Sequence, residues 1–333
     1  MPLGAQAQAL PPVTVGAGVQ TSFVHTEPDG ATGTDNFVLN SVRLYVNGSP
    51  ANKIKFMFNT EYDGAGNHVT VLDAVARFEL SNQFNIWAGR LVPPSDRANL
   101  YGPYYAHHWA TFSDGIQGGY PFVSAGRDNG VVYWGQFGML KVAAGGFDGP
   151  SATKKDKLIG AGRVMLDFWD PEPGYYLNGT FYSEKNILAV GAAGEVQDGN
   201  TAFNVDFLLE RKVGSGGSFS IESEYAKYDR LGGYNSRYGT DEGGYALASF
   251  LFPGAVGMGR VEVLGKYAKA TFGRGRTLLD RDYDQKTTEV NLNYIIKDFN
   301  ARVMVFYKDT RFSALNAVQS NFKQVGVGVQ LQM

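Results

Sequence analysis

The chain has 333 residues, no cysteine and a formal net charge of −2, and only 19% of its residues are charged. The absence of cysteine excludes disulfides, thiolate metal sites and thiol catalysis, and the charge balance gives no sign of a nucleic-acid partner. No run of about eighteen apolar residues is present, so the sequence predicts no transmembrane helix. The sequence does not exclude membrane-spanning strands, because such a strand needs only about ten residues and half of them face lipid.

Residues 1–12 precede the first predicted strand. The segment Pro2 to Ala9 has the small-x-small pattern of a signal-peptide cleavage region. We interpret residues 1–12 as the remnant of an export-signal region and linker, with an ordinary disordered tail as the alternative. Residues 13–333 are predicted to form a single domain.

Alternation of apolar and polar residues is the main structural signal after Val13. In the last segment, for example, Val325, Val327 and Val329 share one face, and the Gly and Gln residues between them share the other. A period of two predicts strands. The polar faces are rich in Gln, Asn, Gly and charged residues, which suits contact with water. A soluble β protein with as many strands should instead show a shared core of bulky residues. The predicted strands are 13–23, 38–47, 53–62, 72–80, 84–92, 131–134, 140–144, 158–168, 187–196, 202–212, 218–229, 242–252, 259–271, 285–296, 300–310 and 320–332.

The stretch 170–186 decides the strand count. Tyr175 to Tyr182 could form a strand, but the total would then be odd. Single-chain bacterial barrels have an even number of strands with short periplasmic turns and long outer loops. We therefore interpret 170–186 as one long periplasmic turn, and we predict an all-β fold, a sixteen-stranded antiparallel transmembrane β-barrel.

Residues 93–129 form a connection that is far longer than usual, which indicates a functional or a disordered segment. Four tyrosines, a tryptophan and two phenylalanines argue against disorder, because so much aromatic surface would be buried somewhere. We predict that this third loop folds into the mouth or lumen of the barrel and constricts it. Its tyrosines could also offer a surface on which sugars or other ring-bearing solutes slide. The candidate constriction residues are Arg97, Asp114, Arg127, Asp128, Tyr104 and Tyr105.

Charged residues on the faces opposite the apolar ones are predicted to line the lumen. The stretch 206–224 is acidic, whereas the first half of the chain and the strands near 260–308 lean basic. Closing the barrel would set these walls against each other and create a transverse field that passes small polar solutes. The alternative is that the charges pair along neighbouring strands and only hold the wall together. The basic candidates are Arg43, Lys55, Arg77, Lys141, Arg163, Arg260, Lys266, Arg302 and Lys308, and the acidic ones are Asp206, Glu210, Glu222 and Glu224.

Catalytic and metal sites are not predicted. A lipid-cleaving barrel would need a serine–histidine pair on its outer face, and most of the four histidines fall in predicted loops. His107 and His108 are adjacent, so in an extended chain they point to opposite sides. We expect no enzyme activity, no metal and no cofactor.

Four consecutive segments carry a likeness to a known family. They are Ser41–Gly48, Ile54–Asp63, Leu72–Phe78 and Trp87–Pro94, the last of which ends in a Gly-x-φ-x-Pro-Pro-type element. This order resembles the phosphate-selective porin O and P family of Gram-negative outer membranes, in which such an element leads into the third, constricting loop. The likeness covers residues 40–95, and Asp170 to Ile187 is similar to the mid-chain turn of that family.

The resemblance implies a trimeric porin of the outer membrane in contact with lipid and lipopolysaccharide. Phosphate-selective members line their pore with an arginine ladder and loop lysines, but residues 93–129 contain no lysine. We therefore expect passive diffusion of small polar or charged solutes and ions. Two alternatives stay open: an anion- or phosphate-preferring pore, and a plugged barrel that serves as a surface scaffold or houses a partner protein.

Overall fold

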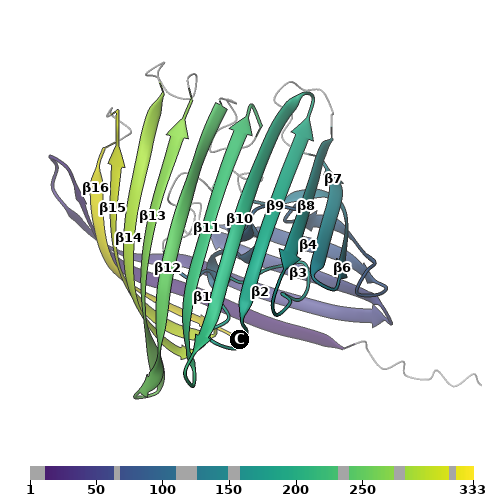
Figure 1. The fold of residues 1–333 in the computed structure, drawn as a ribbon, viewed down its shortest axis with the longest axis horizontal. Coiled ribbons are helices and arrows are strands. Elements are labelled where there is room, and N and C mark those ends of the chain that lie inside the picture. Colours follow the sequence, from purple (N-terminus) through teal and green to yellow (C-terminus); the bar gives the residue numbers. More distant parts are fainter. Residues whose placement is uncertain are drawn as a thin grey trace, which may run out of the picture.

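The computed structural model describes residues 12–63, 68–109, 126–148, 158–231, 240–273, 282–314 and 320–333. Within these residues sixteen antiparallel strands follow one another in sequence order, and β16 (Phe322–Gln332) pairs with β1 (Val13–Pro28) to close the barrel (Figure 1). The predicted strand number and order are confirmed. The other strands are β2 (Thr34–Ala51), β3 (Ile54–Asp63), β4 (His68–Glu79), β5 (Asn85–Leu91), β6 (Asp128–Phe137), β7 (Leu140–Phe147), β8 (Ile159–Asp167), β9 (Ile187–Gln197), β10 (Asn200–Val213), β11 (Gly217–Asp229), β12 (Thr240–Val256), β13 (Gly259–Phe272), β14 (Tyr283–Lys297) and β15 (Ala301–Phe312).

The two faces of each strand differ in chemistry as the alternation predicts. On β13, Glu262 and Lys266 face inward and are buried, whereas Val263 and Tyr267 face outward and are exposed. The same division continues along β14, and on β15 the buried inner positions carry Arg302 and Lys308 together with Met304 and Phe306. An apolar outer band around a polar interior is the arrangement that lipid outside and water inside require.

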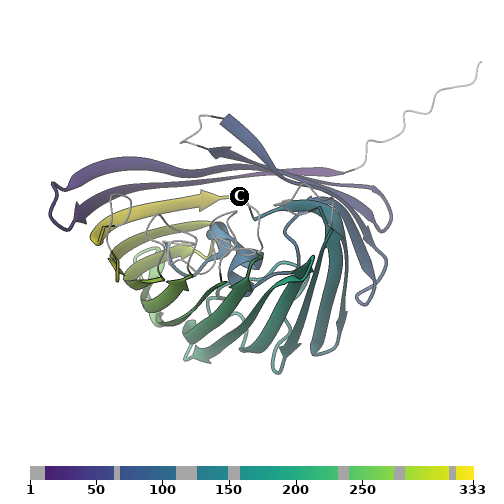
Figure 2. The same cartoon turned by 90° about the horizontal axis from the view of Figure 1, so that it is seen from above.

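Among the described residues, two segments that are not strands lie in the barrel interior. The third loop contributes the short helix α1 (Arg97–Tyr101) and the 3₁₀ turn η1 (Pro103–Tyr105), and both lie inside the barrel (Figure 2). The second segment is 168–186, which contains no strand, so the predicted long turn between β8 and β9 is confirmed. Across the described residues, no helix is long and apolar enough to cross a membrane.

Local chemistry explains where α1 begins and ends. The Asp96 carboxylate accepts a hydrogen bond from the Asn99 backbone N–H at 2.7 Å and so caps the helix N-terminus. Gly102, at φ 64°, ends the helix, because glycine adopts this left-handed conformation without a steric penalty. The result is a compact turn that presents Tyr101 and Tyr104 to opposite parts of the interior.

Candidate constriction site

Arg302 on β15 holds the loop against the wall. Its guanidinium donates hydrogen bonds to the carbonyl oxygens of Ala106 at 2.6 Å and Tyr104 at 3.2 Å. It also donates to the Tyr182 hydroxyl at 3.1 Å and to Oε1 of Gln330 at 2.7 Å, and its side chain is almost fully buried. Hydrogen bonds from a charged donor are the stronger kind, so Arg302 joins the loop, the 168–186 segment and two strands at one point.

Glycines on the inner wall make room for the rings of the loop. A Cβ added to Gly328 on β16 would lie 2.5 Å from the Trp109 ring, and one on Gly18 would lie 2.6 Å from the Tyr104 ring. Side chains at these positions would therefore push the loop away from β1 and β16. This close approach gives a structural role to Gly18 and Gly328.

Three carboxylates of the inner wall contact the loop and the 168–186 segment. Oε1 of Glu222 accepts hydrogen bonds from the Tyr101 hydroxyl at 2.8 Å and the Tyr245 hydroxyl at 2.6 Å. Glu262 lies 2.6 Å from Nε2 of His107. Glu210 accepts from the hydroxyl of Thr180 and from backbone N–H groups of that segment. These carboxylates therefore anchor the interior segments instead of facing an open lumen.

A buried charge cluster connects α1, the 168–186 segment and the wall. Arg97 donates to both carboxylate oxygens of Glu172 at 2.9 and 2.5 Å, and Arg163 donates to both oxygens of Asp206 at 2.5 and 2.8 Å. Nε of Arg97 also lies 3.7 Å from Asp206, so the two pairs form one cluster. Lys141 donates to the carbonyl oxygen of Glu172 at 2.6 Å. Arg97 is 0% exposed, which places it away from any open passage.

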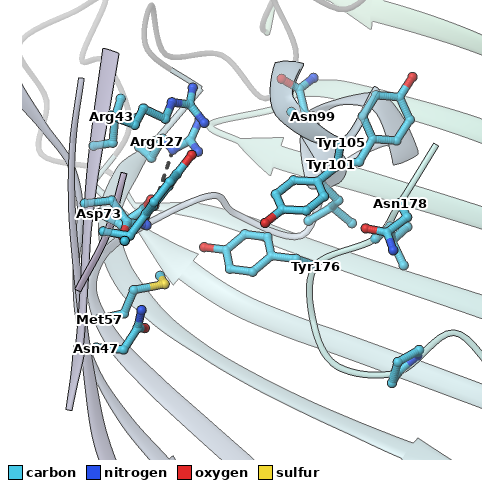
Figure 3. Close-up of a pocket in the computed structure, with 18 of the residues that line it drawn as sticks. Arg43, Asn47, Met57, Asp73, Asn99, Tyr101, Tyr105, Arg127, Tyr176 and Asn178 are labelled. Carbon is cyan, nitrogen blue, oxygen red and sulfur yellow. Dashed lines mark hydrogen bonds and ion pairs between the residues drawn. The ribbon is translucent and has the colours of Figure 1, made fainter. Parts of the chain in front are cut away.

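A cavity of about 530 Å³ lies between the loop and the wall made by β1 to β4. Arg43, Asp73 and Arg127 lie on the wall side of this cavity (Figure 3). Tyr101 and Tyr176 lie on the opposite side, and the Tyr176 hydroxyl points toward the wall (Figure 3). We call this space the constriction cavity.

The charges around the constriction cavity occur as pairs. Arg127 lies 3.3 Å from Asp73, which also accepts a hydrogen bond from Asn59 at 2.8 Å. Arg43 pairs with Glu61, and its guanidinium lies 5.0 Å from the centre of the Tyr104 ring. Each of these two guanidinium groups therefore has a carboxylate partner on the same wall.

The structure separates the predicted constriction residues into several environments. Arg127 and Tyr105 line the constriction cavity. Tyr104 is buried between Gly18 and Arg43, Arg97 lies in the buried charge cluster, and Asp128 is buried at the start of β6. Asp114 lies outside the described residues. The role of each of these residues in conduction stays a prediction.

The predicted lumen residues lie on the inner faces of their strands, but only Arg43 lines the constriction cavity. Most of the others contact interior segments or neighbouring wall residues. Lys266 lies 3.2 Å from His108 and 4.1 Å from the centre of the Tyr245 ring. Their roles in conduction also stay predictions. The remaining residues of this set are Lys55, Arg77, Lys141, Arg163, Asp206, Glu210, Glu222, Glu224, Arg260, Arg302 and Lys308.

The 168–186 segment contributes residues that the sequence did not single out. Glu172, Tyr176 and Asn178 all line the constriction cavity, although this segment was interpreted only as a turn. Its length and its aromatic pair Tyr175–Tyr176 were the available signals, because an exposed periplasmic turn needs neither. Nothing in strand periodicity indicates that such a turn folds inward.

The titration of two loop side chains, Asp96 and His107, should make the attachment of the loop depend on pH. Burial lowers the pKa of His107, but the charge of Glu262, the hydrogen bond to it and the charges of Glu210 and Glu222 together raise it more, so the net pKa is raised. Burial raises the pKa of the Asp96 carboxyl to about 7. Both groups hold their proton more tightly in the folded loop than in the unfolded chain. The stability that these protonated groups give the folded barrel is therefore present at low pH and is lost as the pH rises. The loss begins above the ordinary pKa of each group, about 4 for Asp96 and about 6.5 for His107.

We expect the melting temperature of the detergent-solubilised barrel to fall between about pH 5 and pH 9. The fall should be smaller in the Asp96→Asn and His107→Gln variant, which has no titrating group at either position. Differential scanning calorimetry of both proteins over this range measures the difference. Identical pH profiles would contradict the assignment to these two groups.

Comparisons with known proteins agree on the fold. No protein-family model and no curated protein sequence matches the chain. Among solved structures, an anion-selective porin from Comamonas acidovorans has a TM-score of 0.62 at 15% identity, covering 97% of this chain and 100% of that one. OmpF of Salmonella typhi, solved with daunomycin, has a TM-score of 0.63 at 13% identity, covering 96% and 97%. The outer-membrane channel DcaP of Acinetobacter baumannii has a TM-score of 0.63 at 13% identity, covering 99% of each chain. The chain therefore has the barrel fold of outer-membrane porins.

Proposed function

We propose that the chain is a porin of the Gram-negative outer membrane, which forms a water-filled channel for passive diffusion of small polar or charged solutes and ions. The observation that carries this proposal is the constriction cavity. A closed barrel is narrowed by its third loop, yet space of about 530 Å³ stays free on the β1 to β4 side. Solutes would pass there, because the opposite half of the interior is packed by the loop and the 168–186 segment. Catalysis is not part of the proposal.

The paired charges favour weak ion selectivity. Selective anion transport requires basic groups that lack carboxylate partners, whereas Arg43 pairs with Glu61 and Arg127 with Asp73. This pattern favours a general pore over the phosphate-preferring pore that membership of the porin O and P family would bring. A homotrimer in contact with outer-membrane lipid and lipopolysaccharide completes the proposal.

Recording in a planar lipid bilayer under a salt gradient tests this function. We expect stepwise increases of conductance as the protein inserts, closure in three steps for a trimer, and a small reversal potential. A large anion-favouring potential would support the phosphate-preferring pore instead. A silent membrane that contains folded, inserted protein would support the plugged scaffold.

Neutralising one sign of charge in the constriction cavity should shift its selectivity. In the Arg43→Gln and Arg127→Gln double variant, Glu61 and Asp73 lose their counter-charges, so we expect at least about a threefold increase in the ratio of cation to anion permeability. The Glu61→Gln and Asp73→Asn double variant should shift the ratio in the opposite direction. The reversal potential measures both.

Arg230→Gln is the matched control for this pair of variants. Arg230 is largely exposed beside Asp229 and does not line the constriction cavity. Its replacement should leave the reversal potential unchanged. Equal shifts in the control and the double variants would place Arg43 and Arg127 outside the conduction path.

A further inference from the structure

We propose that the constriction cavity is a binding subsite for a neutral, hydroxyl-rich ring solute of the size of a monosaccharide or a disaccharide. This inference rests on the proposed porin function, and it names the class of solute that binds in the pore during its passage. It depends on three properties of the described cavity: its charge balance, the hydroxyl and amide groups that line it, and the aromatic ring and amides placed on its opposite sides.

The charge balance selects against an ion as the preferred occupant. A phosphate or carboxylate would have to compete with Glu61 for Arg43 and with Asp73 for Arg127. A cation would meet the same two guanidinium groups. A neutral polar molecule requires neither pair to break, so the pairs act as a fixed polar surface.

Side chains with hydroxyl and amide groups line the cavity from the wall and from the 168–186 segment. They include Tyr45 and Asn59 on the wall and Tyr176 on the segment. Sugar hydroxyls both donate and accept, so one such solute can satisfy phenol and amide groups together.

Rings and amides complete the site. Tyr105 is 40% exposed and presents apolar ring surface to the cavity. Asn47, on the wall, and Asn178, on the 168–186 segment, lie on opposite sides of the space (Figure 3). A volume of about 530 Å³ falls in the range of small-molecule sites, and such sites combine apolar and aromatic lining with a few placed polar groups.

Maltose is the probe for this subsite, and a polyethylene glycol of similar mass is the size control. We expect maltose to reduce the open-channel current in a planar bilayer to a saturating extent, whereas polyethylene glycol should reduce it linearly with concentration. Tyr176→Phe removes a single hydroxyl and should raise the half-saturating concentration of maltose by about threefold or more. Asn178→Ala, on the same side of the cavity, should raise this concentration by a similar factor.

Tyr225→Phe serves as the matched control, because Tyr225 faces outward and is 39% exposed. It should leave maltose block unchanged. Non-saturating maltose block in a conducting wild-type channel would overturn the subsite and leave the porin function standing. Saturating block that neither cavity variant weakens would also overturn it. A membrane without any conductance in the absence of sugar would overturn the porin function itself.

Discussion

Replacing Arg302 with Met is expected to raise the single-channel conductance at least about twofold and to admit larger solutes, because the loop loses an attachment to the wall that is made through a buried, charged donor. Arg302 donates to the carbonyl oxygens of Tyr104 and Ala106, and no other side chain donates to that second carbonyl among the contacts of the described residues. Hydrogen bonds to a charged group contribute about 1.5–3 kcal/mol each. Glu262 still contacts His107, and Gln330 still donates to the Tyr104 carbonyl, so we expect the loop to be loosened and not released.

Arg311→Met is the matched control for this experiment. Arg311 lies on the same strand, but its side chain is exposed and pairs with Asp29 and Asp309 at the outer end of the barrel. Conductance of the control should equal that of the wild type. An Arg302→Met channel with unchanged conductance and unchanged solute cut-off would show that the loop holds its position without this residue.

Replacing Arg97 with Met is expected to destabilise the folded barrel by about 3–5 kcal/mol, because it leaves Glu172 as a buried charge without its main partner. Arg97 and Glu172 are both almost fully buried, so water cannot compensate for the loss. Urea unfolding of the detergent-solubilised protein, followed by tryptophan fluorescence, gives the change in the free energy of unfolding.

A double variant separates the buried charge from the lost contact. Arg97→Met combined with Glu172→Gln should recover part of the lost stability, since the second change removes the unpaired carboxylate. Arg230→Met, at an exposed position, should change the free energy of unfolding by less than about 0.5 kcal/mol. A double variant less stable than Arg97→Met would contradict the account of this cluster.

The strands were predictable because, in a membrane barrel, apolar residues that face lipid alternate with residues that face the interior along every strand. Alternating faces gave the number and order of strands, and the even-number rule assigned 170–186 to a turn. The ends were less accurate: β2 spans Thr34–Ala51 against the predicted 38–47, and β6 spans Asp128–Phe137 against 131–134. Backbone pairing continues at these ends, where residues no longer meet lipid and the alternation fades.

The interior was much less predictable than the wall. Helix α1 is only five residues long, which is too short to produce a helical period in the sequence. Arg97 meets Glu172 and Asp206, and nothing in local spacing indicates such distant partners. The predicted transverse field treated the acidic stretch 206–224 as free, but Glu210 and Glu222 accept hydrogen bonds from the interior segments. Those charges therefore hold the constriction in place.

Cysteine labelling tests the central claim, that solutes pass through the constriction cavity. The chain contains no cysteine, so Tyr105→Cys introduces a single thiol at a partly exposed position that lines the cavity. Arg230→Cys introduces one at an exposed position outside it. A charged methanethiosulfonate reagent is added to each channel in a planar bilayer. The account predicts that modification of Tyr105→Cys lowers the single-channel current and that modification of Arg230→Cys leaves it unchanged. Complete modification of Tyr105→Cys with an unchanged current would show that solutes take another path.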